Sequence, residues 1–238
     1  MNQSKNSMPV AISQFGENVE TSREPQITRA IEWLLQQPGG SITVVTPQKA
    51  VDSDAIKSLI AQRGVTHLSW RGLSTKSLRG RILFAWPDRK RLNDLWGLEV
   101  DALAVIEWVP QETKEWIEDN RPVLLLHNQT KPYTLDEEEQ ISSERLPNGV
   151  EEILENIALW AAGYSNGLKW DEEDKLKADM MNRPQRWSSV TVDQVRAKCR
   201  ELGMRPNDVD TVAKLLQRRK DGHSFRVTSS YRDFYFNR

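Results

Sequence analysis

Asp88 and Glu107 are the two residues of this sequence best suited to chemistry, since each follows a short apolar stretch that has the composition of a strand. Carboxylates at the ends of neighbouring strands can bind a metal ion or act as general acid and base. Structural roles compete with this reading: Asp88 precedes a helical segment and is suited to cap it, and Glu107 could pair with Arg89 or Arg91. No catalytic motif accompanies the two carboxylates, so the structural roles are favoured.

Other catalytic and cofactor motifs are missing from the 238 residues. The sequence has no glycine-rich phosphate loop of the Walker A or G-x-G-x-x-G type and no G-x-S-x-G turn. His67, His127 and His223 are far apart, and the single cysteine, Cys199, lies on a helical segment where a packing role is favoured. We therefore expect no cofactor and no metal site.

Basic residues are concentrated between positions 71 and 91, a segment that contains seven basic residues and one acidic residue. They are Arg71, Lys76, Arg79, Arg81, Arg89, Lys90 and Arg91. With Trp70 and Trp86 beside them, they predict a surface that contacts nucleic-acid phosphates and stacks on bases. The alternative is that these side chains pair with the acidic runs at 136–139 and 171–174 of the same chain.

A second basic cluster, Arg218, Arg219 and Lys220, ends the second of two helical segments, 192–202 and 208–220. Their spacing resembles a helix-turn-helix. A recognition helix usually reads bases from its N-terminal part, and here that part carries Asp208 and Asp210, which phosphates would repel. Packing is therefore favoured over base reading.

The elements that position these residues alternate between apolar strands and helices. Helices are predicted over 25–37, 52–63, 89–96 and 110–120, and strands over 42–45, 65–70, 81–86, 102–108 and 123–127. Such alternation is typical of a parallel sheet covered on both faces. The fold class is α/β: a three-layer Rossmann-like domain with a mostly parallel five-stranded sheet, followed by a helical C-terminal region.

Ligands of open parallel sheets bind beyond the carboxyl ends of the strands. The residues expected there are Thr46, Lys49, Trp70, Arg71, Asp88, Arg89, Glu107, Trp108, His127 and Asn128.

The chain is divided by composition into four parts. Residues 1–24 are polar and predict a mobile arm, and 25–130 form the Rossmann-like domain. Residues 131–149 predict an acidic surface loop, and 150–238 a helical region with a basic tail. The amphipathic segment 150–162 is expected to cover the sheet.

Charge and tryptophan content bear on partners. Residues 183–238 carry 13 basic and 6 acidic side chains, whereas residues 1–182 carry 20 and 28. Among nine tryptophans, Trp33, Trp96, Trp108, Trp116 and Trp160 fall on expected core or rim positions. Trp70, Trp86, Trp170 and Trp187 lie nearer loops and are candidates for a partner surface.

The residues Ile82 to Asp88, Leu92, Ala102 to Pro110 and Trp116 form a pattern that resembles uncharacterised actinobacterial proteins. In that pattern, one apolar strand ends in Trp-Pro-Asp and another ends in Trp, and a tryptophan follows on the next helix. The segment leading to 222–226 is also similar. The resemblance implies a Rossmann-like domain with a helical C-terminal part and implies no activity.

These observations predict a non-catalytic binding or accessory protein whose partner is a protein or a nucleic acid. An enzyme that acts on a phosphate-containing substrate at the strand ends is the alternative. The single cysteine and the absence of a secretory signal or an apolar span predict a cytoplasmic protein with no membrane partner. Nothing in the sequence predicts its oligomeric state.

Overall fold

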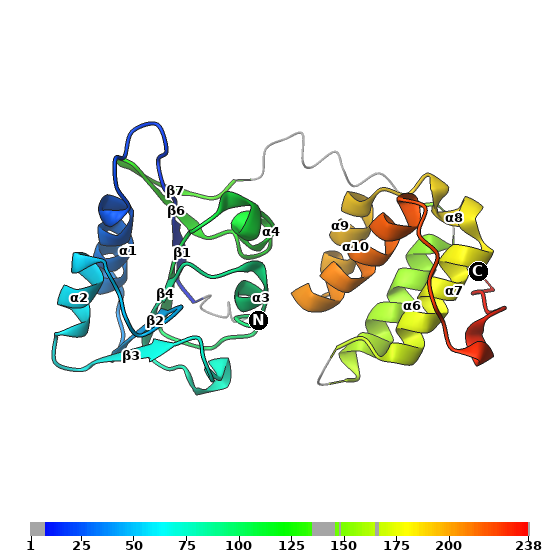
Figure 1. The fold of residues 1–238 in the computed structure, drawn as a ribbon, viewed down its shortest axis with the longest axis horizontal. Helices are drawn as coiled ribbons and strands as arrows, with labels where there is room; N and C mark the ends of the chain where they lie inside the picture. Colours follow the sequence, from blue (N-terminus) through cyan, green and yellow to red (C-terminus); the bar gives the residue numbers. More distant parts are fainter. Residues whose placement is uncertain (1–7, 135–145, 148, 165–166, 238) are drawn as a thin grey trace, which may run out of the picture. The chain divides into compact units, whose positions relative to one another are not determined.

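A computed structural model describes residues 8–134, 146–147, 149–164 and 167–237. The chain divides into two compact units, Met1–Thr134 and Leu135–Arg238 (Figure 1). We call them unit 1 and unit 2 and describe each by itself. Most of the predicted acidic loop, at 135–145 and 148, lies outside the described residues.

Unit 1 is an α/β unit built on a seven-stranded, mostly parallel sheet with the strand order β3-β2-β4-β5-β1-β6-β7. The strands are β1 (Val10–Ser13), β2 (Ile42–Thr46), β3 (Val65–Ser69), β4 (Arg81–Ala85), β5 (Ala102–Ile106), β6 (Val123–Leu126) and β7 (Gln129–Pro132). All neighbouring pairs are parallel except β6 and β7, which are antiparallel.

The five predicted strands are present, but the count of five is wrong. The predicted mobile arm is also wrong where its residues are described, from position 8 onward. Residues 10–13 form β1, which lies inside the sheet between β5 and β6. The side chain of Gln26 fastens β1 to the following helix, because its Nε2 donates to the Ser13 carbonyl at 2.8 Å. A four-residue strand in a polar segment offers too short an apolar run for sequence periodicity to detect.

Helices cover both faces of the sheet, as Figure 1 shows. α1 (Glu24–Gln36) and α2 (Asp54–Ile60) lie on one face, and α3 (Arg89–Asn93) and α4 (Pro110–Asn120) on the other. Each face has its own apolar cluster, because successive side chains of a strand point to opposite faces. Val44 of β2 packs toward α1 and α2, and its neighbour Val45 toward α3 and α4. A short 3-10 turn, η1 (Thr75–Ser77), connects β3 to β4.

The connections reverse direction between the adjacent strands β2 and β4. The chain leaves β2 through α2 on one face and leaves β4 through α3 on the other. Two connections that part in this way open a crevice above the carboxyl ends of their strands, which is where ligands of open α/β sheets bind.

Unit 2 is helical and has its own core. Its helices are α6 (Val150–Ala162), α7 (Trp170–Asn182), α8 (Pro184–Ser188), α9 (Val192–Glu201) and α10 (Pro206–Lys220), and a 3-10 turn, η2 (Ser229–Tyr231), follows them. The expectation that 150–162 covers the sheet is wrong. The buried face of α6, for example Ile153 and Ile157, belongs to a cluster made of unit 2 residues, because the later helices offer it an apolar partner.

Among the described residues, no helix combines the length and the apolar composition needed to cross a membrane.

Candidate functional site

A cavity of ≈ 680 Å³ lies in unit 1 at the carboxyl ends of the strands. Its wall is formed by residues from the starts of α1 and α2 and from the segments that follow β2, β3, β4 and β5. They are Arg23, Glu24, Ile27, Pro47, Gln48, Ala50, Val51, Asp52, Ser53, Trp70, Trp86, Pro87, Asp88, Trp108, Val109 and Glu112. We call it the tryptophan cavity; it lies at the point where the connections of β2 and β4 part.

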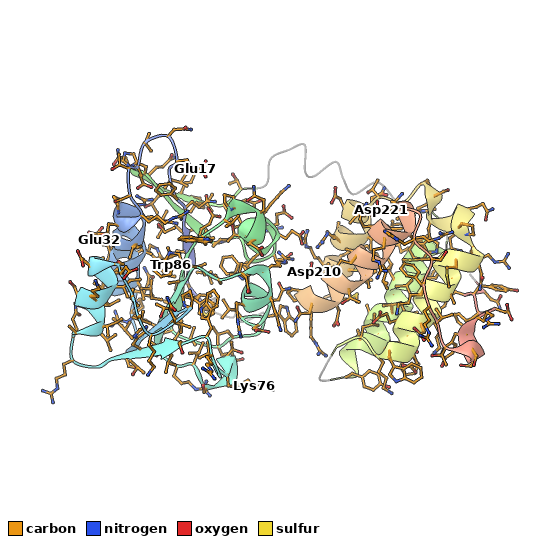
Figure 2. All side chains as sticks on the ribbon, viewed as in Figure 1. Glu17, Glu32, Lys76, Trp86, Asp210 and Asp221 are labelled. Atoms are coloured by element: carbon orange, nitrogen blue, oxygen red, sulfur yellow. The ribbon has the colours of Figure 1, made fainter. Side chains whose placement is uncertain are left out.

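The three tryptophans reach the cavity because each follows a strand of the sheet. Trp70 comes directly after β3 and Trp86 directly after β4, while Trp108 lies two residues beyond β5. Figure 2 shows Trp86 between the two helical layers of unit 1. Its backbone adopts a left-handed conformation, with φ 56°, while its N–H donates to the Ile106 carbonyl at 2.8 Å. The fold therefore holds a non-glycine residue in an uncommon conformation at the cavity wall.

The indole nitrogens of Trp70 and Trp86 are shielded from solvent and have no hydrogen-bond partner in the described part of the chain. Atoms that solvent cannot reach do not face an open cavity, so these rings present carbon to it. A buried, unpaired donor costs about 1–3 kcal/mol of stability. The unpaired donors thus oppose the stability that the two rings gain by packing against the apolar clusters of the sheet.

Arg23 stacks on the aromatic wall. Its guanidinium carbon lies 4.3 Å from the ring centroid of Trp108 and 4.7 Å from that of Phe15. The guanidinium also donates to the Glu107 and Trp108 carbonyls, at 3.3 and 3.1 Å. The protein itself thus engages the one basic residue of the described wall.

Carboxylates of the cavity wall cap nearby helix N-termini. The Glu24 carboxylate accepts from the Ala55 N–H of α2 and from the Ser53 hydroxyl, both at 3.2 Å. Exposed backbone N–H groups at helix starts are the usual site for phosphate in parallel α/β folds. Here a side chain of the protein already fills that position on α2.

The start of α3 is closed in the same way. Asp88 accepts from the Arg91 N–H at 2.8 Å, and Glu112 accepts from the Arg89 N–H at 2.7 Å. The capping role of Asp88 is therefore confirmed.

Glu107 is buried in a separate environment and does not line the cavity. It accepts hydrogen bonds from Thr113 Oγ1 and, at 3.3 Å, from Gln14 Nε2. Desolvation by burial raises the pKa of its carboxyl, although the bonds from Thr113 and Gln14 oppose the rise. A catalytic pair of Asp88 and Glu107 would need β4 and β5 to be neighbours, and they are. The two carboxylates nevertheless bind different groups, since Asp88 accepts from the Arg91 N–H and Glu107 from Thr113.

The expected partners of Glu107 were wrong. Arg89 forms an ion pair with Glu115 at 2.6 Å, and Arg91 pairs with Asp94 at 3.6 Å. The first pair joins α3 to α4 and the second joins residues three positions apart, whereas the buried Glu107 carboxylate is bonded by Thr113 and Gln14.

The other candidate nucleophiles and bases have structural partners. His67 Nε2 lies 2.7 Å from Thr46 Oγ1, and desolvation followed by the charge of Lys49 lowers its pKa. Cys199 is buried in unit 2, and desolvation raises the pKa of its thiol to about 12, so the packing role is favoured.

His127, at the other expected strand end, lies beside a smaller hollow of ≈ 480 Å³ that includes Asn128. Its Nδ1 is 3.7 Å from the buried carboxylate of Glu20. The same carboxylate pairs with Arg29, whose bond holds the pKa of Glu20 below its usual value.

The predicted basic surface of 71–91 is divided between the two ends of β4. Arg81 begins the strand and donates to the carbonyls of Leu35, Gln37 and Gly40, at 3.2–3.3 Å. Arg79 also bonds backbone carbonyls, at Lys76 and Leu78. Arg89, Lys90 and Arg91 come after the other end of the strand, whose length from Arg81 to Ala85 is about 13 Å at 3.3 Å per residue. Arg71, Lys76, Arg79 and Lys90 are the exposed members.

The basic cluster of unit 2 has packing partners. Arg219 donates to the Met180 carbonyl at 3.2 Å, Lys220 donates to the Ser188 carbonyl at 3.2 Å, and Arg218 lies over the Phe225 ring at 5.6 Å. At the other end of α10, Asp210 pairs with Arg196 at 2.8 Å. This geometry favours packing for the α9–α10 pair.

The tryptophan expectations are confirmed at some positions and wrong at others. Trp96, Trp108 and Trp160 were expected at core or rim positions and are about half exposed, with 56%, 51% and 47% of their surface accessible, which excludes the core alternative. Trp187, expected near a partner surface, is 2% exposed and donates its indole N–H to Asp179. Trp116 is buried as expected.

Sequence reasoning placed Trp70, Asp88 and Trp108 at this edge of the sheet but missed the wall supplied by α1. Arg23 and Glu24 precede the first predicted strand, so nothing placed them at a strand end. They reach this edge because α1 follows β1, and the short run 10–13 was the signal that could have revealed it.

No group of three His, Cys, Asp or Glu side chains suited to a metal ion occurs within the described ranges. Comparison of the chain with protein-family models, curated proteins and solved structures finds no match.

Proposed function

We propose that this chain is a non-catalytic binding protein and that the tryptophan cavity of unit 1 is its ligand site. The observation that carries the proposal is the position of the cavity, at the point where the connections of β2 and β4 part. Its ≈ 680 Å³ lies within the range of about 300–1,000 Å³ typical of small-molecule sites.

The strand order supports a Rossmann-like, doubly wound assignment for unit 1. Without β1, strands β2 to β6 follow the spatial order β3-β2-β4-β5-β6. This is the 2-1-3-4-5 order of doubly wound folds that bind their ligand between the first and third strands. In this numbering those strands are β2 and β4, beside the tryptophan cavity.

The side chains of the cavity favour binding over catalysis. Asp88 and Glu112 accept from helix N–H groups, and Arg23 donates to carbonyls of the wall, so each has a structural task. The alternative, an enzyme for phosphate-containing substrates, is disfavoured because four carboxylates and one guanidinium line the wall. The ligand could be free or part of a protein partner. A nucleic-acid partner draws less support, because its proposed contacts are divided along β4.

The experiment is a saturation-transfer NMR screen of chemically diverse small molecules against three proteins. These are the wild type, Trp108→Ala and Trp96→Ala. Trp96 is a matched control, because it is similarly exposed in unit 1 and does not line the cavity. We expect a set of compounds that bind the wild type and Trp96→Ala but not Trp108→Ala. If no compound distinguishes Trp108→Ala from the wild type, the cavity is not a ligand site.

A further inference from the structure

We infer that the tryptophan cavity binds an apolar cation, an alkylated ammonium group being the simplest example. This inference rests on the proposed function and specifies the class of ligand. It is carried by the aromatic wall, by the excess of carboxylates around it and by a cation of the protein that already lies on one of the rings.

The aromatic wall supplies the attraction. Trp70, Trp86 and Trp108 line the cavity, and an indole face attracts cations more strongly than any other side-chain ring. Trp86 and Trp108 meet edge to face, with ring centroids 6.2 Å apart and an interplanar angle of 75°. Two perpendicular rings can form a corner in which a rounded group contacts more than one aromatic surface.

Arg23 and Arg91 show that these rings accept cations. The Arg23 guanidinium carbon lies 4.3 Å from the Trp108 centroid, and that of Arg91 lies 5.9 Å from the Trp70 centroid. Both distances are within the range of about 6 Å for cation–π attraction.

The charge of the wall selects against anions. Glu24, Asp52, Asp88 and Glu112 line the cavity with Arg23 as the one base, and none of the four forms an ion pair with a residue in the part of the chain that the structure describes. Glu24, Asp88 and Glu112 accept hydrogen bonds from uncharged N–H and O–H groups. The helix N-termini offset part of this negative charge but do not reverse it.

The first experiment compares choline with its neutral isostere, 3,3-dimethylbutan-1-ol, by isothermal titration calorimetry on the full chain. The two molecules have the same shape and differ in the charge of one atom. We expect choline to bind at least about tenfold more tightly, a difference of about 1.4 kcal/mol, because the indole faces attract the charged group and not its neutral isostere.

Substitutions in the cavity wall test whether the preference for choline over its isostere arises there. Asp52→Asn combined with Glu112→Gln removes two charges without changing side-chain size, and should weaken choline binding at least about fivefold while leaving the isostere unchanged. The matched control is Asp54→Asn, because Asp54 lies on α2 near Asp52 but is absent from the cavity wall. The control should bind choline as the wild type does.

An additional titration with a peptide identifies the source of the cation. A short peptide that contains trimethyllysine is titrated beside choline; tighter binding of the peptide assigns the cation to a protein partner, and equal or weaker binding assigns it to a free amine. Equal binding of choline and its isostere, or loss of choline binding in Asp54→Asn alone, would overturn the inference. Binding of the isostere that Trp108→Ala abolishes would still uphold the proposed function, so the two failures can be told apart.

Discussion

The rings of Trp86 and Trp108 meet edge to face, with centroids 6.2 Å apart, although the two residues follow different strands and are 22 positions apart. Their contact follows from the pairing of β4 with β5, which places Ala85 beside Ile106. The residues that leave these strands must then turn away from the sheet side by side. Sheet register thus brings together two aromatic side chains that no local motif connects.

Trp86→Phe tests whether indole at this position serves binding or folding. Phenyl keeps an aromatic contact with Trp108 and removes the unpaired indole N–H, so thermal unfolding should show stability within about 1 kcal/mol of the wild type. Choline affinity should fall several-fold, because phenylalanine attracts cations less than tryptophan does. A large loss of stability with unchanged affinity would show that the indole serves packing instead.

The pH dependence of stability should carry a contribution from Glu107. Burial raises the pKa of its carboxyl above the ordinary 4.5, so the folded state favours the protonated form more than the unfolded state does. The contribution of Glu107 is therefore fully present below about pH 4.5 and is lost as the pH rises through the higher folded value.

Glu107→Gln should reduce this decline in the free energy of unfolding, measured by urea titration at several pH values. The decline should be steepest between about pH 4.5 and the folded pKa in the wild type. A variant with the same slope as the wild type over that interval would contradict the assignment.

The amino-acid pattern predicted five of the seven strands, β2 to β6, and the four helices of unit 1, because their apolar periodicity is local. It failed where tertiary context decides. β1 is four residues long and gains its stability from β5 and β6 on either side. Which tryptophans are buried depends on the helices that cover them, as Trp187 and Trp108 show. The cavity needs the ends of four strands, β2 to β5, together with the starts of α1 and α2, which only the sheet order brings together.

Asp179 should be essential to the stability of unit 2. Its buried carboxylate accepts bonds from Arg186, from the Trp187 indole and from the Phe236 N–H, at 2.8–2.9 Å. Asp179→Ala would remove the buried acceptor that these three donors share and should cost about 3–5 kcal/mol. Chemical denaturation measures the loss of stability.

The control is Asp233→Ala in the same unit. Asp233 is at an exposed position of the C-terminal segment, and its substitution should change stability by less than about 0.5 kcal/mol. Equal effects of the two changes would remove the special role of Asp179.

The Glu20–Arg29 pair should stabilise unit 1 above the folded pKa of Glu20. The side chain of Glu20 is 1% exposed and that of Arg29 19%, so Glu20→Gln should cost roughly 3 kcal/mol at pH 7. Arg29 lowers the pKa of Glu20, so this stability is present above the unfolded value of 4.5 and is lost as the pH falls through the folded value. The difference between variant and wild type should therefore shrink in acid. A difference that stays constant down to pH 2 would mean that the pair acts through packing alone.

Substitution of Arg81 distinguishes a nucleic-acid contact from a structural role of the basic segment. Its guanidinium donates to Leu35, Gln37 and Gly40 carbonyls at the C-terminal end of α1 and just beyond it. Because these are bonds from a charged donor, Arg81→Ala should cost about 1.5–3 kcal/mol in a denaturant titration. Lys76→Ala is the control, because Lys76 is an exposed basic residue of the same segment and its substitution should leave stability unchanged.

Both proteins are then titrated with duplex DNA at several salt concentrations. If DNA binds this segment, each substitution should lower the salt slope by about one unit, because each lost phosphate contact releases about one fewer counterion. On the structural account, neither substitution changes the slope and only Arg81→Ala changes stability. A shallower slope in Arg81→Ala with unchanged stability would overturn that account and restore a nucleic-acid surface at the amino end of β4.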